Sequence, residues 1–419
     1  MPRSPFSFYG WRITGALAVT TTINYGVLFY VFSVLTKPME AEFDWTRSQT
    51  SVAFSLAALT NGLTAVFTGR VVDRFGGRWL MAGGSLAGGA CLVSWSYVRT
   101  LTELYIVFAA LGLVWSAVFY DVAFSVIATW FRKDRAKATF AITIVAGFAS
   151  TIFYPAISRL DASLGWRETL RWLALLTVLV TGSLHVGVLR ESPSALGLVV
   201  DGTDFDEAST EPSEQSTTLA EARRTSAFWK LTWVFGIARF VATGISAHLF
   251  PLLIEQGRSP AFAASVAGAV GPMQVVGRFL FLPVSRRVSL RSLTTVTMVI
   301  LGAGLLALAV STSIISIVVF VVLFGIANGT ATMNRAGLTS ERFGSAAFGQ
   351  ISGFMGGVGA VMSVFAPAAL GLGRTWSGDY IWALIGLSIA AAIGAVTMHA
   401  TEEDSNKSEE VSDLPNIAR

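Results

Sequence analysis

A short charged segment, Gly69-Arg70-Val71-Val72-Asp73-Arg74-Phe75-Gly76-Gly77-Arg78, separates two long apolar stretches. The stretch before it covers about residues 47–69, and the stretch after it covers about residues 77–98. A helix needs about 20 apolar residues, at ~1.5 Å each, to cross ~30 Å of hydrocarbon. Both stretches are long enough, so the segment is predicted to be a tight loop between two membrane-spanning helices.

The same alternation of apolar and charged sequence continues along the chain. Of its 419 residues, 53% are hydrophobic and 13% are charged, and the mean hydropathy is +0.62. A soluble domain carries about 25% charged residues, so this composition excludes a soluble protein and predicts an all-α membrane protein. The net charge of +4 is too small to indicate a nucleic-acid partner. Twelve candidate spans cover about residues 11–36, 47–69, 77–98, 102–129, 137–158, 168–189, 228–254, 260–285, 290–311, 314–336, 346–370 and 378–399.

Two long polar stretches organise these spans. We predict a six-helix bundle over residues 1–189, a cytoplasmic central loop over 190–227, a second six-helix bundle over 228–399 and an acidic cytoplasmic tail over 400–419. An internal repeat supports this division, because Phe153-Tyr154-Pro155-Ala156 recurs as Phe365-Ala366-Pro367-Ala368, 212 residues later. With one residue of slippage, Arg74 and Arg78 match Arg287 and Arg291. Duplicated halves around a midplane site are typical of transporters.

The charges of the short loops predict the orientation of the chain. Loops on the side of the two termini carry eleven basic residues against three acidic ones, whereas the other loops carry similar numbers of each sign. Basic residues concentrate on cytoplasmic loops, so we expect both termini in the cytoplasm. We expect a multi-pass monomer in a cell membrane, specifically the bacterial inner membrane. The eleven are Arg70, Arg74, Arg78, Arg132, Lys133, Arg135, Lys137, Arg286, Arg287, Arg291 and Arg342.

The loop at residues 69–78 resembles the G-x3-D-R-x-G-x-R signature of the major facilitator superfamily. The resemblance covers about residues 8–400 and implies twelve transmembrane helices in two six-helix pseudo-repeat bundles. Glycines allow a tight turn, and the acid and arginines can bond to neighbouring helix ends. We therefore expect conformational gating, rather than substrate binding, from Gly69, Asp73, Arg74, Gly76 and Arg78.

Shorter motifs are similar to the oxalate:formate and monocarboxylate transporter branch of that superfamily. They are Tyr9-Gly10-Trp11 before span one, Trp130-Phe131-Arg132-Lys133-Asp134-Arg135 after span four and Gly277-Arg278-Phe279 in span eight. This resemblance implies that Arg278 binds a substrate carboxylate and that Tyr120 and Tyr154 help to line the site. One feature departs from the branch. Some of its oxalate carriers have a second basic residue in span eleven, and this chain has none there.

Four ionisable residues fall within the predicted spans: Asp121, Arg239, Arg278 and Arg335. An arginine at the centre of a membrane helix costs about 2.5–3.5 kcal/mol even on the lenient insertion scale, so these side chains must face a cavity or a partner. One acid cannot neutralise three guanidinium groups. Because a guanidinium matches a carboxylate in bidentate geometry, the excess of positive charge favours an anionic substrate.

Asp121 has two interpretations. It is either the proton-coupling site, protonated and deprotonated as its surroundings change, or a permanent salt bridge to Arg239 or Arg335. Polar and aromatic residues near these charges could orient a small ligand. Together with Arg278, Arg239 and Arg335, the candidate substrate-binding residues are Asn24, Tyr25, Tyr120, Tyr154, Gln274 and Asn328.

These features favour a secondary transporter that moves a small organic anion, a mono- or dicarboxylate, by alternating access with proton symport. The alternative within transport is an exporter or exchanger of an anionic metabolite or drug. An enzyme is not expected, because the three histidines, His185, His248 and His399, lie on separate elements and form no catalytic or metal-binding set. We expect no cofactor and no metal, and the partners are the organic anion, a proton and the lipid bilayer.

Overall fold

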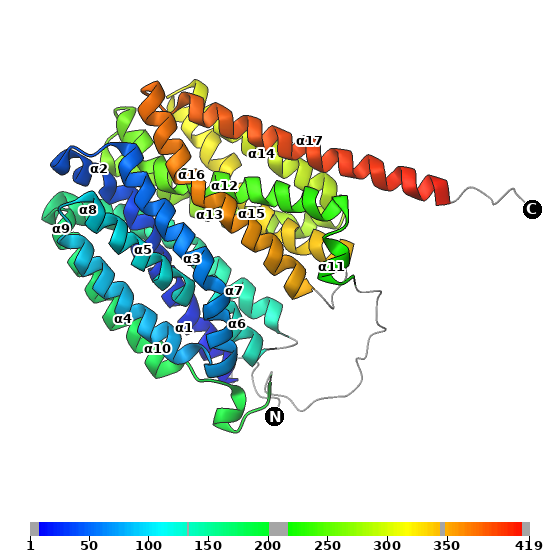
Figure 1. Cartoon of the computed structure of the whole chain (residues 1–419), viewed down its shortest axis with the longest axis horizontal. Helices are drawn as coiled ribbons and strands as arrows, with labels where there is room; N and C mark the ends of the chain where they lie inside the picture. The colour runs from blue at the N-terminus through cyan, green and yellow to red at the C-terminus, as the bar shows by residue number, and fades with distance from the viewer. Residues whose placement is uncertain (1–7, 132–133, 201–216, 344–347, 413–419) are drawn as a thin grey trace, which may run out of the picture. The chain divides into compact units, whose positions relative to one another are not determined.

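A computed structural model describes residues 8–131, 134–200, 217–343 and 348–412, and every regular element in these ranges is a helix (Figure 1). The prediction of an all-α membrane protein is confirmed. The first half contains α1 (Tyr9–Asn24), the π-helical segment η2 (Tyr25–Tyr30), α2 (Val31–Phe43), α3 (Arg47–Phe75), α4 (Gly77–Ser96), α5 (Leu101–Val118), α6 (Tyr120–Trp130), α7 (Arg135–Gly147), α8 (Ala149–Leu164), α9 (Trp166–Leu176), the π-helical segment η3 (Thr177–Gly182) and α10 (Ser183–Val188).

The second half has longer unbroken helices. After the 3-10 turn η4 (Pro193–Leu196) and the short α11 (Leu219–Ala222) come α12 (Ser226–Glu255), α13 (Pro260–Ser285), α14 (Leu290–Val310), α15 (Ile314–Phe343), α16 (Phe348–Ser377) and α17 (Ile381–Ser412). Helix α17 continues 13 residues beyond the expected span end at residue 399. The remainder of the tail, 413–419, and residues 201–216 of the central loop lie outside the described residues.

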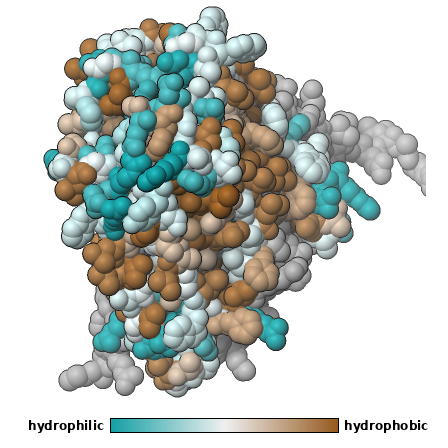
Figure 2. Space-filling view, turned by 60° about the vertical axis from the view of Figure 1, so that its left-hand side comes forward, coloured by the Kyte–Doolittle hydropathy of each residue, from teal (hydrophilic) through white to brown (hydrophobic). Residues whose placement is uncertain are grey.

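Twelve helical runs occupy the positions of the twelve expected spans. Ten of them are long and apolar enough to cross a bilayer within the described residues. The other two are α3 and α4, which flank the loop at residues 69–78 and are 29 and 20 residues long. Large exposed apolar side chains occur on many of the helices. Figure 2 shows hydrophobic residues among hydrophilic ones on the face in view. Such a surface is expected where lipid replaces water as the surrounding medium.

Capping boxes explain where several helices begin. In each one a threonine hydroxyl accepts a hydrogen bond from the backbone three residues on, and the side chain at that position caps the threonine N–H. The boxes are Thr46 with Gln49 before α3, Thr100 with Glu103 before α5 and Thr218 with Glu221 before α11. The hydrogen bonds from Thr218 also lower the pKa of Glu221 below its ordinary value.

Four of the expected spans are not uniform α-helices. Span four breaks at Phe119, whose ψ is −168°, so that α5 ends and α6 begins within the membrane segment. Span five is similarly divided at Phe148. Spans one and six each contain a six-residue π-helical segment. Such segments occur frequently at functional sites.

The contacts divide the chain into two compact units. The first comprises Met1–Glu211, Gly244–Pro272 and Val364–Gly378, and the second comprises Pro212–Thr243, Met273–Ser363 and Asp379–Arg419. The first unit therefore includes the ends of α12 and α16 and the beginning of α13, which come from the second half of the sequence. The assignment of residues 1–189 and 228–399 to two six-helix bundles stays a prediction.

The aromatic motifs identified in the sequence pack together at one end of the first unit. Trp11 contacts Phe131 with ring centroids 5.1 Å apart, and Tyr9 contacts Trp130 at 5.7 Å. The hydroxyl of Tyr9 also donates a hydrogen bond of 2.9 Å to the carbonyl oxygen of Val188. The motifs before span one and after span four thus join three helix ends in one buried core.

Candidate functional site

The break at Phe119 brings predicted site residues of the first unit together. Tyr25, in η2, stacks on Phe119 with centroids 4.3 Å apart and lies 4.9 Å from the ring of Tyr120. The three rings are partly or almost fully buried. The sequence predicted Tyr25 and Tyr120 as site residues on different spans, and the structure makes them neighbours on one aromatic wall.

Asn24 and Tyr154 are held in place by backbone contacts. The Asn24 amide donates to the carbonyl oxygen of Val118 at 3.3 Å, where α5 ends and its last carbonyls lack helical partners. The Tyr154 hydroxyl donates to the carbonyl oxygen of Ser246 at 3.1 Å. Asn24 therefore stabilises the helix break, and Tyr154 joins α8 to α12. A role of either residue in binding stays a prediction.

Asp121 lies directly after the same break, in the first turn of α6. Its side chain is exposed, and it has no ion-pair or hydrogen-bond partner among the described residues of its own unit. The N-terminus of a helix favours a negative charge through its unpaired N–H groups and dipole. The helix break therefore gives Asp121 local electrostatic support without an arginine from the same unit.

In the second unit, two of the three predicted arginines approach the same face of α16. The carbon Cδ of Arg239 lies 3.6 Å from the position where a Cβ would stand at Gly359, and Nη1 of Arg335 lies 3.2 Å from that position at Gly356. Gly356 and Gly359 are one turn apart, so they share a helix face. Arg239 is exposed at mid-helix and has no polar partner among the described residues of its unit.

Arg278 differs from Arg239 because it is buried, with 6% of its surface exposed. It follows Gly277, where α13 packs so closely on α15 that an added Cβ would lie 2.5 Å from the carbonyl oxygen of Ile326. Gln274, one turn earlier, is half-buried on the same helix. Asn328 turns back to its own helix, since its amide donates to the carbonyl oxygen of Phe324 at 2.9 Å.

The loop at residues 69–78 forms the expected tight turn. Gly76 alone separates α3 from α4, with φ at +73°, and Gly77 leaves no room for a Cβ against Val126. Arg78 donates from Nε and Nη2 to the carbonyl oxygen of Val186, at 3.1 and 2.8 Å, near the end of α10. Arg74 is exposed, and its guanidinium lies over the ring of Phe75.

Two residues of the predicted gating set, Gly69 and Asp73, add nothing to this description of the turn. An added Cβ at Gly69 would meet no atom within 4 Å, so its lack of a side chain is not required by packing. The side chain of Asp73 lies outside the described residues. The turn geometry thus depends on Gly76 and Gly77, while the bond to a neighbouring helix end comes from Arg78.

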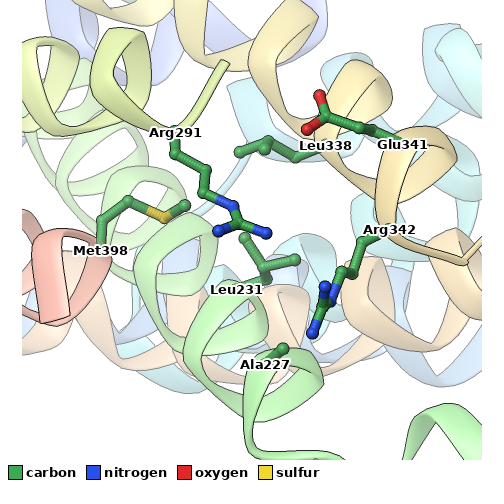
Figure 3. Close-up of a pocket in the computed structure, with 7 residues that line it drawn as sticks. All are labelled: Ala227, Leu231, Arg291, Leu338, Glu341, Arg342 and Met398. Atoms are coloured by element: carbon green, nitrogen blue, oxygen red, sulfur yellow. The ribbon is translucent and has the colours of Figure 1, made fainter. Parts of the chain in front are cut away.

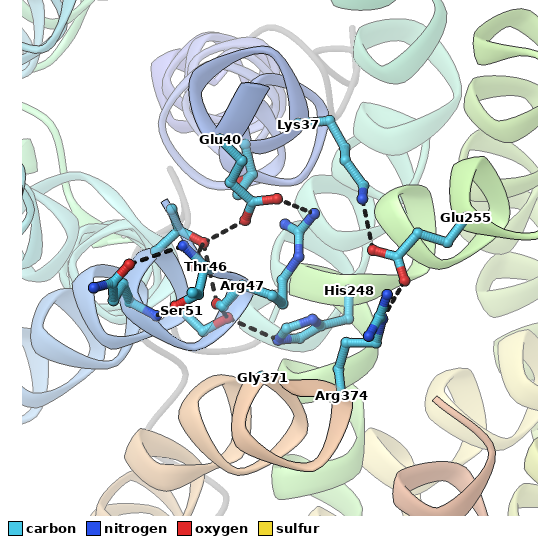
Figure 4. Close-up of polar contacts among 12 residues, drawn as sticks. Lys37, Glu40, Thr46, Arg47, Ser51, His248, Glu255, Gly371 and Arg374 are labelled. Carbon is cyan, nitrogen blue, oxygen red and sulfur yellow. Dashed lines mark hydrogen bonds and ion pairs between the residues drawn. The ribbon is translucent and has the colours of Figure 1, made fainter. Parts of the chain in front are cut away.

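An interhelix ion cluster, absent from the sequence prediction, lies in the first unit and comprises Lys37, Glu40, Arg47, Glu255 and Arg374 (Figure 4). Glu255, at the end of α12, pairs with Lys37 of α2 at 2.6 Å and with Arg374 of α16 at 2.5 Å. These three side chains are 19–31% exposed. The cluster therefore joins one helix of the first half to two helices of the second half.

The second pair of this cluster is more deeply buried. Arg47 and Glu40 lie 2.7 Å apart, with 5% and 11% of their side chains exposed. Beside them, the Nε2–H of His248 donates to the carbonyl oxygen of Pro367 at 2.9 Å and lies 3.2 Å from the Ser51 hydroxyl. His248 is thus a structural histidine that ties α12 to α3 and α16.

Comparison with known proteins agrees with this architecture. Residues 17–367 match the family model of the Major Facilitator Superfamily. The chain belongs to the major facilitator superfamily. It resembles the crystal structure of a bacterial homologue of the human lysosomal transporter Spinster, with a TM-score of 0.75 and 14% identity, over 94% of this chain and 97% of that chain. The expected major facilitator fold is confirmed.

Several curated members of the superfamily are related at low identity. Human monocarboxylate transporter 7 is 23% identical over 47% of this chain and 38% of its own length. Mouse monocarboxylate transporter 11 is 25% identical over 64% and 58%, and the MFS transporter asaE of Aspergillus flavus is 26% identical over 62% and 56%. The matches thus span between about a third and three fifths of these relatives. They are consistent with the resemblance to the monocarboxylate branch and show a multi-pass membrane transporter.

Proposed function

We propose that this transporter moves a small organic anion, a mono- or dicarboxylate, by alternating access coupled to proton symport. The observation that carries the proposal is the one-sided charge of the second unit. Its membrane helices α12, α13 and α15 carry Arg239, Arg278 and Arg335. No Asp or Glu occurs in residues 226–243, 273–340, 348–363 or 381–400.

Arg239 is the arginine best placed to meet a substrate. It is exposed in the middle of α12, and its Cδ lies against the face of α16 that carries Gly359. The cost of such a charge, about 2.5–3.5 kcal/mol on the insertion scale, falls when an anion binds it. Buried Arg278 would then shape the positive potential of the site, with Arg335 contributing from α15.

The first unit supports an organic rather than an inorganic anion. Its aromatic wall of Tyr25, Phe119 and Tyr120 presents ring surface that suits the apolar part of a carboxylic acid. The names of two relatives, monocarboxylate transporters 7 and 11, agree with this chemistry. We further propose that the chain acts as a monomer in a bacterial inner membrane, with both termini in the cytoplasm.

Uptake by purified protein in liposomes tests the proposal, with a panel of radiolabelled mono- and dicarboxylates. Arg239→Gln should abolish uptake, whereas Arg99→Gln, the same change at an exposed position before α5, should leave it intact. If no carboxylate moves, or if Arg239→Gln transports normally, the proposed site is wrong. Counterflow without a pH gradient would identify the alternative, an exchanger.

Proton coupling is tested separately through Asp121. An inward-directed proton gradient should drive accumulation in the wild-type protein, and Asp121→Asn should still exchange labelled for unlabelled substrate while losing that accumulation. An amide can keep the hydrogen-bonding shape of the carboxyl group but cannot carry the proton. Gradient-driven accumulation by Asp121→Asn would show that Asp121 is structural.

A further inference from the structure

A pocket in the second unit lies where four helices reach the same end of the unit. It is lined by Ala227 and Leu231 of α12, Arg291 of α14, Leu338, Glu341 and Arg342 of α15, and Met398 of α17. Ala227 and Arg291 stand in the first turns of their helices, and Arg342 stands in the last turn of α15. Since these helices span the membrane, their ends place the pocket at the level of the lipid headgroups.

The pocket combines two guanidinium groups with an apolar floor. Figure 3 shows Arg291 and Arg342 extending into it from different helices. Behind them, Leu231, Leu338 and Met398 are at most 3% exposed, so the floor is closed. Arg342 is exposed and Arg291 is half-buried, and neither pairs with Glu341 or with any other described residue. The arginines are therefore available to a ligand from outside.

The sequence repeat shows that this availability is specific to the second half. Arg291 corresponds to Arg78, whose guanidinium donates two hydrogen bonds to the carbonyl oxygen of Val186. Arg291 has no such acceptor in its own unit, although it occupies the matching position at the start of a helix. One copy of the repeated arginine is thus used to join helices, and the other remains open to an external anion.

We propose that this pocket binds the phosphate group of an anionic phospholipid. Arginine forms bidentate hydrogen bonds with phosphate, and basic pockets between membrane helices are known lipid-headgroup sites. A lipid phosphate is present at this depth at high local concentration. The pair of guanidinium groups against one carboxylate gives the pocket a net charge of +1.

The acidic tail is a less suitable occupant. Its first acids, Glu402 to Asp404, follow Met398 by four to six residues on the same helix, α17. At ~1.5 Å per residue, their backbone lies about 6–9 Å further along the helix axis. Because α17 continues in helical form to Ser412, the backbone that carries these acids extends beyond the pocket lining.

Native mass spectrometry of the full-length protein in detergent tests the proposal without a transport assay. The protein is mixed with phosphatidylglycerol or with zwitterionic phosphatidylcholine, and the bound fraction is measured. Wild-type protein should retain phosphatidylglycerol selectively. Removing both arginines in Arg291→Gln/Arg342→Gln should weaken retention about 30-fold, because each basic residue near a membrane surface contributes roughly a factor of five.

A matched control removes the same charge at the same end of the unit. Arg286 and Arg287 are exposed just before α14 and line no part of the pocket. Arg286→Gln/Arg287→Gln should keep wild-type retention. An equal loss in both double variants would show general electrostatic attraction and overturn the proposal. In Arg291→Lys/Arg342→Lys, which keeps the charge without the planar fork, partial retention is expected even if the glutamine variant folds poorly.

Two further experiments distinguish binding of the lipid from binding of a soluble anion or of the acidic tail. Excess inorganic phosphate should leave most phosphatidylglycerol bound, because a free phosphate lacks the membrane-level anchoring of the lipid. Full displacement by phosphate would show a soluble-anion site instead. Truncation after Ala400 should not change lipid retention, and a large increase on truncation would show that the tail occupies the pocket.

Discussion

Glu255 is the residue whose loss should weaken the interhelix ion cluster most. Its two oxygens contact Lys37 and Arg374, at 2.6 and 2.5 Å, and Glu255→Gln removes the charge from both bonds while leaving two cations close together. Each pair is partly exposed, so solvent screening limits its contribution to about 1 kcal/mol. The loss of about 2 kcal/mol corresponds to a ~30-fold shift toward the separated state of these helices.

Thiol labelling measures this shift directly. In a Cys91→Ser background, Ser51→Cys places a single thiol where Ser51 is fully buried and where Gly371 of α16 packs against it. A maleimide can reach that thiol only when α16 moves away from α3. Adding Glu255→Gln should accelerate labelling by about 30-fold, because the labelling rate follows the population of the open state.

The control is another ion pair in the same unit. Glu42 pairs with Arg167 at 2.6 Å, but both residues belong to the first half of the sequence. Glu42→Gln should therefore leave the labelling rate of the Ser51→Cys thiol unchanged. If Glu255→Gln labels no faster than Glu42→Gln, the ion cluster does not hold α12 and α16 against α2.

Two local predictions concern the turn at Gly76 and the capping box of α11. Gly76→Ala should lower the thermal unfolding temperature of the detergent-solubilised protein, because φ is +73° and an added Cβ would lie 3.1 Å from the backbone of Glu191; the strain is about 1 kcal/mol. Gly69→Ala, which meets no atom, should not destabilise, and equal effects would contradict the turn argument. A second prediction concerns the capping box of Thr218 and Glu221, in which hydrogen bonds from Thr218 lower the pKa of Glu221 below its ordinary value of 4.5. The capping box should therefore stabilise α11 fully above about pH 4.5, and this stabilisation should be lost as the pH falls through the lowered pKa. Amide hydrogen exchange of α11 measures this stabilisation. If the difference in exchange between the wild-type protein and Thr218→Ala did not change with pH, the prediction would be wrong.

The positions of the spans could be predicted because hydropathy and loop charge are local properties. Gly76 and Arg78 also followed from a local motif, and the structure gives both a mechanical role. The helix break at Phe119 could not be predicted, since Val118-Phe119-Tyr120 contains no proline or glycine. The break is supported by tertiary contacts, including the bond from Asn24 to Val118 and the stacking of Tyr25 on Phe119.

The interhelix ion cluster shows a second limit of sequence reasoning. Glu255 is separated from Lys37 by 218 residues and from Arg374 by 119. Each residue alone is typical of a charge at the end of a membrane helix, where water lowers its cost. Only the packing of α2, α12 and α16 turns these separate end charges into one network. A pattern of this kind leaves no periodicity or spacing that could identify it in a single sequence.

The membrane charges are sorted between the two units, and this sorting constrains the mechanism. Residues 226–243, 273–340, 348–363 and 381–400 of the second unit contain no Asp or Glu, while Asp121, Glu40 and Glu255 all belong to the first unit. Glu40 and Glu255 are already paired within that unit, and Asp121 is not. An uncompensated arginine at the middle of a membrane helix, the position of Arg239, would cost about 2.5–3.5 kcal/mol. Under the proposed function, water or the bound anion supplies that compensation, and loss of one increases what the other must supply.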